Sequence, residues 1–403
     1  KMKIRTWWQK PKKLKDRDIH RRVSFLELFY DLVYVVLIAE FAHSLSSHVE
    51  PVKVVEFSFM FVLVWIAWVN GTMYYELHGN IDLRTRLFTF AQMFTVVGMS
   101  VFAHNAMGEG AAGFALCFAV YQLLLTWLWW RTGIHDPDHR PLSNPYSLLF
   151  LLSAGLFAGS AFTPEAWILP MWILALFLSL ITPLVLLVLG RRNPKVQEQL
   201  NLSSVLNESA IERFGLLMII VLGEIIASVV RGISGHHHVT TSVGIAAALG
   251  MMIAVGIWWI YFDFISQQRP EPSRNASYIW LYLHLPITLG IVSTGAAIVN
   301  ALAHADSELN LPGRLLLSES IGLTLISIFL LMQILHIPES YKKIYFWGKI
   351  ITIFSGLVIG AIGFIHLKTI LFLYAIVGVL LVPVIFGAIV WIKLSMKENF
   401  NNN

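Results

Sequence analysis

The sequence is poor in charged residues and nearly free of cysteine. Asp, Glu, Lys and Arg make up 13% of the 403 residues, about half of their share in a typical soluble domain. Cys117 is the only cysteine, so the chain can form no internal disulfide and no cysteine-rich metal site. It also lacks a phosphate-binding glycine loop, a nucleophile elbow and the Cys/His spacings of zinc sites. These absences argue against a water-soluble enzyme, and we expect no cofactor and no metal site.

Hydrophobic residues, by contrast, are abundant. They make up 57% of the sequence, and the mean hydropathy is +0.68. They fall in runs of about twenty residues, the length that an α-helix needs to cross roughly 30 Å of hydrocarbon. The sequence therefore predicts an all-α integral membrane protein with about twelve transmembrane helices. The predicted spans lie near residues 23–45, 52–75, 86–107, 111–130, 146–163, 166–190, 209–231, 241–264, 277–303, 314–335, 344–365 and 368–392.

The basic residues predict the orientation of the chain. Ten of the 29 Lys and Arg residues lie in the first 22 positions. Cytoplasmic loops are enriched in Lys and Arg, and a cytoplasmic N-terminus places 23 of the 29 on that side and four on the other. We therefore expect both termini in the cytoplasm. In the basic segment 1–22, Trp7 and Trp8 are expected to meet anionic lipid headgroups, so the positive charge requires no nucleic-acid partner.

Internal similarity predicts two halves of six spans each. Residues 23–190 and 209–393 would form the repeats, joined by the cytoplasmic linker 191–208 and followed by the tail 394–403. Repeats with an even number of spans run parallel to each other. The motif at the head of the first span returns 185 positions later at the head of the seventh, and the matching positions are Ser24, Glu27 and Phe29, then Ser209, Glu212 and Phe214.

Pairs of glycines four residues apart occur in both halves, as Gly155/Gly159 and Gly356/Gly360. Small residues at this spacing allow two transmembrane helices to approach closely. The two helices that approach can belong to one chain or to two copies of it, and the sequence does not distinguish these arrangements. A homodimer is therefore one of the two arrangements it allows.

The first span carries three acids. Glu27 and Asp31 are four residues apart and share a helix face, with Tyr34 one turn further along. Glu40 lies two turns beyond Asp31, toward the outer side. A carboxylate inside the bilayer is expensive and is a functional candidate by default. Two interpretations remain open: an ion or proton site, or architectural contacts to nearby arginines such as Arg21.

The seventh span carries a deeper acid. Glu224 lies about four turns into an otherwise apolar helix. A buried carboxylic acid stays neutral unless a cation or a donor compensates its desolvation, so Glu224 is a candidate proton site, with structural hydrogen bonding as the alternative. At the cytoplasmic end of the same span, adjacent Glu212 and Arg213 are expected to form an ion pair, and Glu212 is a further candidate site.

The ninth span contains a histidine beside a helix-kinking proline, in Tyr282-Leu-His284-Leu-Pro286. Proline lacks an N–H, so it frees the carbonyl of Tyr282 for another partner. His284 can titrate near neutral pH. It is therefore a candidate proton site, and the alternative is a hydrogen-bonded packing residue.

Three motifs occur in order along the chain: Phe25-Leu-Glu-Leu-Phe-Tyr-Asp31-Leu-Val-Tyr-Val, then Glu212-Arg-Phe-Gly-Leu with Leu222-Gly-Glu224, then the segment Tyr282 to Pro286. Together they resemble the bacterial low temperature requirement A (LtrA) family over about residues 20–395. The resemblance implies a multi-pass protein of the bacterial cytoplasmic membrane that is linked to growth in the cold. The Asp-rich segment that the family has after span 2 is represented only by Asn80-Ile-Asp82, so its role does not carry over.

A looser likeness concerns the architecture. Arg22 followed by Phe29-Tyr30-Asp31 is similar to the Arg…Phe-Ser-Asp signature of the organellar potassium-channel family, which is built from six-span repeats. Tyr30 stands where that family has Ser and Leu32 where it has Gly, and the second half has Leu216 in place of the aspartate. The likeness supports an analogy of architecture alone.

Acids and a kinked histidine helix at membrane depth lead us to expect proton-linked transport of a small solute or ion. One alternative is a cation channel built from the two repeats. Another is a non-transporting membrane factor that binds lipid or a protein partner, in which the acids only hold helices together. No nucleophile, base and orienting group can be grouped from the sequence, so we do not expect an enzyme.

Overall fold

The computed structural model describes residues 7, 9–18, 21–47, 49–235, 238–266 and 268–401, with side chains up to residue 393. The described part contains thirteen α-helices and three short 3₁₀ turns (η1, Leu14–Asp16; η2, Ala103–Asn105; η3, Glu339–Tyr341). It contains no β-strand, only one isolated bridge between Pro270 and Leu335. This confirms the predicted all-α fold. Helices are expected in a bilayer, because a helix satisfies its own backbone hydrogen bonds.

Eleven of the described helices are long and apolar enough to cross a membrane. Helix α1 (Phe25–Ser47) is not among the eleven, although its 23 residues give it the length to span. The chain is thus a multi-pass membrane protein, and the finer prediction of twelve spans depends on α1, which carries Glu27, Asp31 and Glu40. The two parallel six-span repeats stay a prediction.

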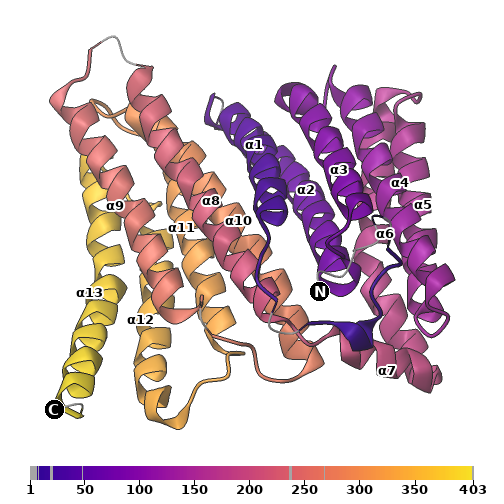
Figure 1. The fold of residues 1–403 in the computed structure, drawn as a ribbon. Coiled ribbons are helices and arrows are strands. Elements are labelled where there is room, and N and C mark those ends of the chain that lie inside the picture. The colour runs from indigo at the N-terminus through magenta and orange to yellow at the C-terminus, as the bar shows by residue number, and fades with distance from the viewer. Residues whose placement is uncertain are drawn as a thin grey trace. The chain divides into compact units, whose positions relative to one another are not determined.

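The chain divides into two compact units, which we describe separately (Figure 1). Unit 1 comprises residues 1–41 and 59–213, and unit 2 comprises residues 42–58 and 214–403. The division passes through α1, α2 (Pro51–His78) and α8 (Glu208–Ser234).

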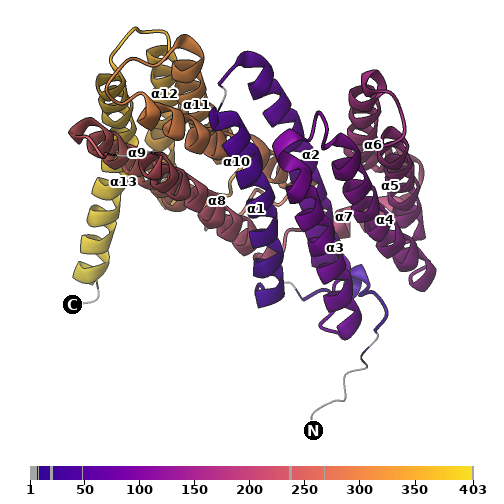
Figure 2. The ribbon, with the colours of Figure 1, turned by 90° about the horizontal axis from the view of Figure 1, so that it is seen from above.

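Within unit 1, each of the helices α3 to α6 packs on the next, and the short helix α7 lies against α5 and α6 (Figures 1 and 2). Asp82 caps α3 by accepting a hydrogen bond from the backbone N–H of Thr85 at 3.0 Å. The helices of this unit besides α1, α2 and α8 are α3 (Leu83–Phe102), α4 (Ala111–His135), α5 (Arg140–Ser160), α6 (Glu165–Arg192) and α7 (Pro194–Ser203).

The predicted linker 191–208 contains the short helix α7. Asn193 caps it by accepting from the backbone N–H of Lys195 at 3.0 Å, and Pro194 occupies its first position. Val196 and Leu200 are four residues apart and pack in a buried cluster with Leu142 and Leu186. The helix forms because it buries this one apolar face, a pattern too short for a search for membrane spans to detect.

The N-terminal segment 9–18 lies against protein. The backbone N–H of Lys12 donates to the carbonyl of His78 at 3.2 Å, and His78 Nδ1 lies 2.8 Å from the Lys12 carbonyl. The backbone N–H of Gln9 donates to Asp82 Oδ2 at 2.7 Å. Burial raises the pKa of Asp82, but its hydrogen bonds from Thr85 and Gln9 outweigh burial, so the pKa lies below the usual value. Lipid contact at Trp7 and Trp8 stays a prediction, and Trp8 lies outside the described residues.

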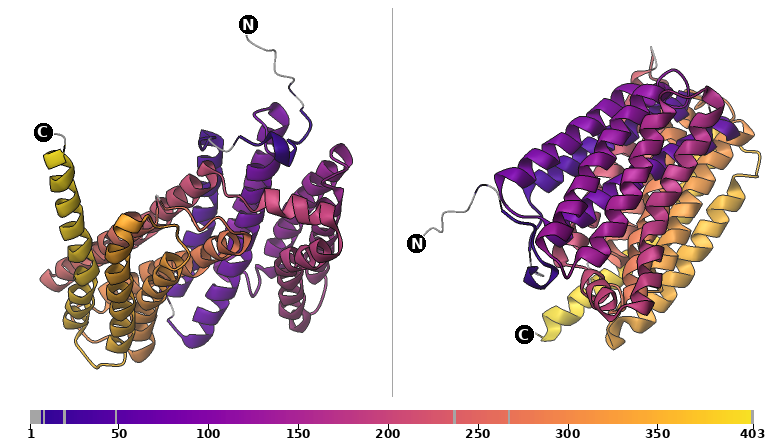
Figure 3. Two further views of the ribbon diagram at one scale, coloured as in Figure 1. Left: turned by 90° about the horizontal axis from the view of Figure 1, so that it is seen from below. Right: turned by 90° about the vertical axis from the view of Figure 1, so that its right-hand side faces the viewer.

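Within unit 2, α10 packs on α11, α11 on α12, and α9 on α13 (Figures 1 and 3). The backbone carbonyl of Gly356 lies 3.1 Å from where a Cβ on Gly322 would be, so α11 and α12 are in close contact at glycine. The Gly356/Gly360 pair therefore packs inside the chain. The helices besides α8 are α9 (Thr241–Phe264), α10 (Arg274–Ala303), α11 (Leu311–Met332), α12 (Lys342–Ile362) and α13 (Thr369–Asn401).

Candidate functional site: a buried network of ion pairs

Arg213 and Asp31 form a fully buried ion pair in unit 1. The guanidinium group donates from Nη2 to Asp31 Oδ1 at 2.7 Å and from Nε to Oδ2 at 3.0 Å. The indole N–H of Trp68 also donates to Oδ1, at 2.7 Å. Both charged side chains are 0% exposed. Two parallel bonds from one guanidinium to one carboxylate are the strongest form of such a contact.

A second part of the network centres on Arg21, which lies just before α1. Its guanidinium donates to both oxygens of Glu27, at 2.8 and 2.9 Å, and to Glu76 Oε1 at 2.5 Å. Ser209 donates to the other oxygen of Glu76 at 2.7 Å. Burial lowers the pKa of Arg21, but the contacts with Glu27 and Glu76 outweigh it, so the pKa lies above the usual value. Arg21 is therefore a permanent positive charge.

The ion-pair network, as we name the set Arg21, Glu27, Asp31, Glu76 and Arg213, holds three carboxylates and two guanidinium groups. The two parts meet where Arg213 Nη1 lies 3.7 Å from Glu27 Oε1. That Nη1 is buried and has no hydrogen-bond partner within the described residues. With all five groups ionised, the set by itself has one more carboxylate than it has guanidinium groups. The charge of nearby Arg17 also acts on Glu76, and Arg213 Nη1 is an unused donor.

Arg17 lies near the network, and within the described residues its hydrogen bonds go to neutral oxygens. It donates to the carbonyl oxygens of Leu202 and Val205, at 3.0 and 3.1 Å, and to the side chain of Asn207 at 2.5 Å. Burial lowers its pKa, and the charge of Glu76 raises it less. Its role is to tie the N-terminal segment to the start of α8.

Three tyrosine hydroxyls line up beside Arg213. The hydroxyl of Tyr30 lies 3.2 Å from that of Tyr34 and 2.9 Å from that of Tyr121, which donates to the carbonyl of Ala67 at 2.7 Å. The Arg213 guanidinium carbon is 5.4 Å from the centre of the Tyr30 ring, within the range of a cation–π contact. Tyr34, predicted to share a face with Asp31, thus reaches the network through Tyr30.

Gly71 of α2 leaves room for the hydroxyl groups of Tyr30 and Tyr121. A Cβ there would overlap the hydroxyl of Tyr30 and lie 2.6 Å from that of Tyr121. We expect Gly71→Ala to lower the free energy of unfolding by about 1–3 kcal/mol, because the buried tyrosines must move. Gly155→Ala on α5 is the matched control, since a Cβ there meets nothing within 4 Å. Equal midpoints for the two variants in thermal unfolding would show that Gly71 is not a required contact.

Glu224 of α8 lies in unit 2 and has a cation partner that we did not predict. It is 5% exposed and forms an ion pair with Arg231, which also donates to Ser228 at 2.9 Å. Seven residues are about two helical turns, so Arg231 lies on the same face as Glu224 and reaches back to it.

His284 is fully buried in unit 2, and both of its ring nitrogens have partners. Nδ1 lies 2.7 Å from the Trp280 carbonyl, which can only accept, so Nδ1 carries the hydrogen. Nε2 lies 2.9 Å from the hydroxyl of Tyr261 and accepts from it in the neutral ring. This arrangement favours the packing interpretation of His284. Pro286 lies inside α10, and Tyr282 is half-buried.

Two further predicted residues lie outside the network. Glu40 is half-buried, nine positions from Asp31. Glu212 is exposed and accepts a hydrogen bond from the backbone of Val23 at 3.3 Å. The predicted Glu212–Arg213 ion pair is wrong, because consecutive residues point about 100° apart around a helix, and Arg213 faces inward to Asp31.

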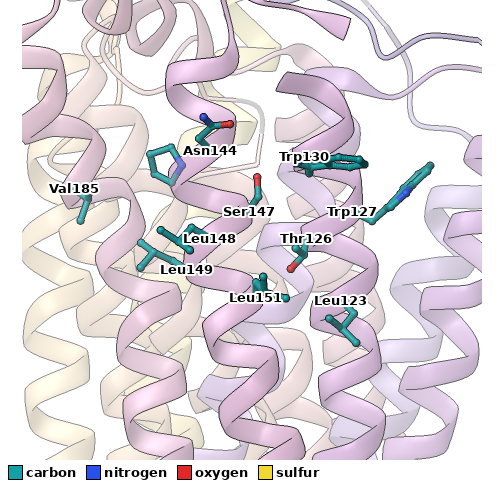
Figure 4. A pocket seen from close by; sticks show the side chains of 11 residues that line it. Leu123, Thr126, Trp127, Trp130, Asn144, Ser147, Leu148, Leu149, Leu151 and Val185 are labelled. Atoms are coloured by element: carbon teal, nitrogen blue, oxygen red, sulfur yellow. The ribbon is translucent and has the colours of Figure 1, made fainter. Parts of the chain in front are cut away.

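Unit 1 also contains an apolar cavity of about 890 Å³ formed by α4, α5 and α6. Leucine and tryptophan side chains dominate its walls, and Figure 4 shows Trp127 and Trp130 on one side and Asn144 and Leu148 on the other. None of the residues of the ion-pair network lines it. In a bilayer such a hollow suits a hydrocarbon chain rather than an ion.

The described residues contain no group of three or more His, Cys, Asp or Glu side chains that could hold a metal. The candidate site therefore consists of ion pairs between carboxylate and guanidinium groups.

A family model described as bacterial low temperature requirement A protein (LtrA) matches residues 22–390. The chain belongs to the LtrA family.

The family match confirms the resemblance carried by the three motifs. Four residues of the ion-pair network lie inside it, and Arg21 precedes it by one position. The LtrA chain is also 26% identical, over 310 residues, to the uncharacterized protein RA0937 of Rhizobium meliloti (strain 1021), a match that covers 72% of each chain.

Proposed function

We propose that this LtrA protein moves a small solute or cation across the bacterial cytoplasmic membrane in a proton-linked manner, and that the ion-pair network is its coupling site. The observation that carries the proposal is that three buried carboxylates share the ion pairs of only two guanidinium groups. A proton or a cation bound there would take the place of a guanidinium partner on one carboxylate.

Stability alone gives little reason to keep these charges. A buried ion pair often stabilises a protein no more than well-packed apolar residues of the same size would. A pair that can separate does provide two alternative states of a helix, each with a different affinity for protons or cations. In this mechanism the carboxylates of Asp31 and Glu27 release the Arg213 guanidinium group and bind a proton or a cation instead. In that second state of the helix, Arg213 can donate to another acceptor through its unused Nη1.

The test is flux into liposomes that contain the purified full-length protein. Proton and potassium gradients are imposed separately, and wild type is compared with Asp31→Asn. We expect the variant to lose at least about tenfold of the pH-dependent flux, because Asn cannot exchange a proton. Glu224→Gln tests the second buried acid in the same assay. Asp138→Asn, in the exposed loop before α5, is the matched control and should behave as wild type.

Wild-type flux that survives in Asp31→Asn would contradict the assignment of the network as the coupling site. The same preparation distinguishes a carrier from a cation channel, since a channel gives single-channel currents and a carrier only slow turnover. The cold-growth link is part of the proposal too, so loss of the protein is expected to slow growth in the cold.

A second candidate is a non-transporting membrane factor, with the acids as fixed contacts between helices. The hydrogen bonding of Asp31 favours this alternative, because both of its carboxylate oxygens already accept hydrogen bonds from Arg213 or Trp68. It predicts that the wild-type protein gives no flux above empty liposomes.

A further inference from the structure

Unit 2 contains a cavity of about 220 Å³ between the end of α9, the start of α12 and the last part of α13. It lies at the helix ends that the charge distribution predicts to be cytoplasmic. One acid, Asp263, lines it. The other lining residues are Phe264, Gln268, Pro338, Tyr341, Ile344, Tyr345, Gly387, Val390 and Trp391.

The Asp263 carboxylate faces bare backbone on α13. A Cβ on Gly387 would lie 2.8 Å from Asp263 Oδ2 and 3.7 Å from the indole nitrogen of Trp259. Glycine at position 387 therefore leaves the room that the carboxylate uses. Among the side chains that the structure describes, no lysine or arginine forms an ion pair with Asp263.

Four of the nine other lining residues are aromatic. Tyr345 donates its hydroxyl to the Phe264 carbonyl at 3.2 Å, and the two ring centres lie 6.0 Å apart, which fixes this side of the cavity. Tyr341 and Trp391 contribute two more rings. Aromatic faces attract organic cations, and sites for substituted ammonium groups combine several such rings.

We propose that this cavity binds a small organic ammonium group, with the nitrogen held by Asp263 and its substituents against the aromatic wall. The carboxylate excludes anions by repulsion, and a single acid is too few oxygens for Mg²⁺ or Ca²⁺. A free amine and the amine headgroup of a lipid share this chemistry. The site belongs to unit 2 and can be occupied without transport, so it stands apart from the ion-pair network.

The experiment is calorimetric titration of the delipidated, detergent-solubilised full chain with choline. We expect saturable binding that weakens about tenfold or more in Asp263→Asn, as expected for a lost charge contact of 1.4 kcal/mol or more. Gly387→Ala should weaken binding too, because the added methyl group meets the carboxylate. Glu308→Gln, an exposed acid in another loop, is the control. Asp263→Glu keeps the charge and should retain part of the affinity if the fold is intact.

Nanodiscs distinguish the two sources of the ammonium group. If a lipid headgroup is the natural occupant, phosphatidylethanolamine nanodiscs should weaken choline binding relative to phosphatidylglycerol nanodiscs; equal binding in the two would assign the site to a free amine. No saturable binding to the delipidated protein, or equal affinity in wild type and Asp263→Asn, would overturn the proposal. Because the measurement is made at equilibrium without a gradient, its failure is distinguishable from a failure of the flux assay.

Discussion

Replacing Arg213 with Met is expected to lower the free energy of unfolding by about 3–5 kcal/mol, since it leaves Asp31 buried without its cation. Asp31→Asn should cost a similar amount, because Arg213 is then the uncompensated charge. The double variant Asp31→Asn/Arg213→Met should cost clearly less than the sum, with a coupling energy of about 2 kcal/mol or more. Equilibrium unfolding in mixed micelles measures all three.

An exposed ion pair gives the comparison for this cycle. Lys53 and Glu56 approach to 2.7 Å on α2, but their side chains are 49% and 32% exposed. The cycle Lys53→Met/Glu56→Gln should show a coupling of less than about 1 kcal/mol, because water screens such pairs. If the Asp31 and Arg213 costs were simply additive, the pair would not be the energetic unit that its geometry indicates.

The second large effect is expected from Arg21→Gln, and it depends on pH. The substitution removes the ion pairs of Arg21 with Glu27 and Glu76, so the native state should be destabilised by about 3–5 kcal/mol at neutral pH. On acidification the native variant takes up a proton more readily than its unfolded chain, because protonation relieves the repulsion. Its stability should therefore rise as pH falls, by up to about 1.4 kcal/mol per pH unit for each proton.

Wild type should show a smaller gain, since Arg21, with its raised pKa, keeps its charge and its ion pairs throughout this range. Unfolding midpoints between pH 5 and 8 measure the difference in slope. Lys15→Gln is the control, because Lys15 pairs with Glu198 where both side chains are more than half exposed. A variant of Arg21 whose pH slope equals that of wild type would argue against an excess of buried negative charge.

The helices could be predicted because hydrocarbon imposes one simple rule: backbone polar groups must be satisfied within a long apolar segment. Helix α7 follows a different rule. It is short and polar overall, and only the packing of Val196 and Leu200 on other helices makes it fold. Search windows of about twenty residues therefore miss it.

The candidate site could be predicted in part. The spacing of Glu27 and Asp31 placed both acids on one face, as the network requires. Their partners could not be predicted, because Asp31 and Arg213 are 182 positions apart and meet only when the start of α8 lies against α1 in the folded unit 1. The Glu224–Arg231 pair, by contrast, follows from helical periodicity, since both residues lie in the predicted span 209–231.

The separation of Asp31 and Arg213 also bears on how the protein enters the membrane. Chains are synthesised at roughly 5–20 residues per second, so the 182 positions between them correspond to roughly 10–40 s of synthesis. During that time α1 has its buried acid but not the cation from α8. The buried acid of α1 can therefore form its ion pair only after α8 has been synthesised. The stable insertion of the first helix thus depends on a helix that is made much later.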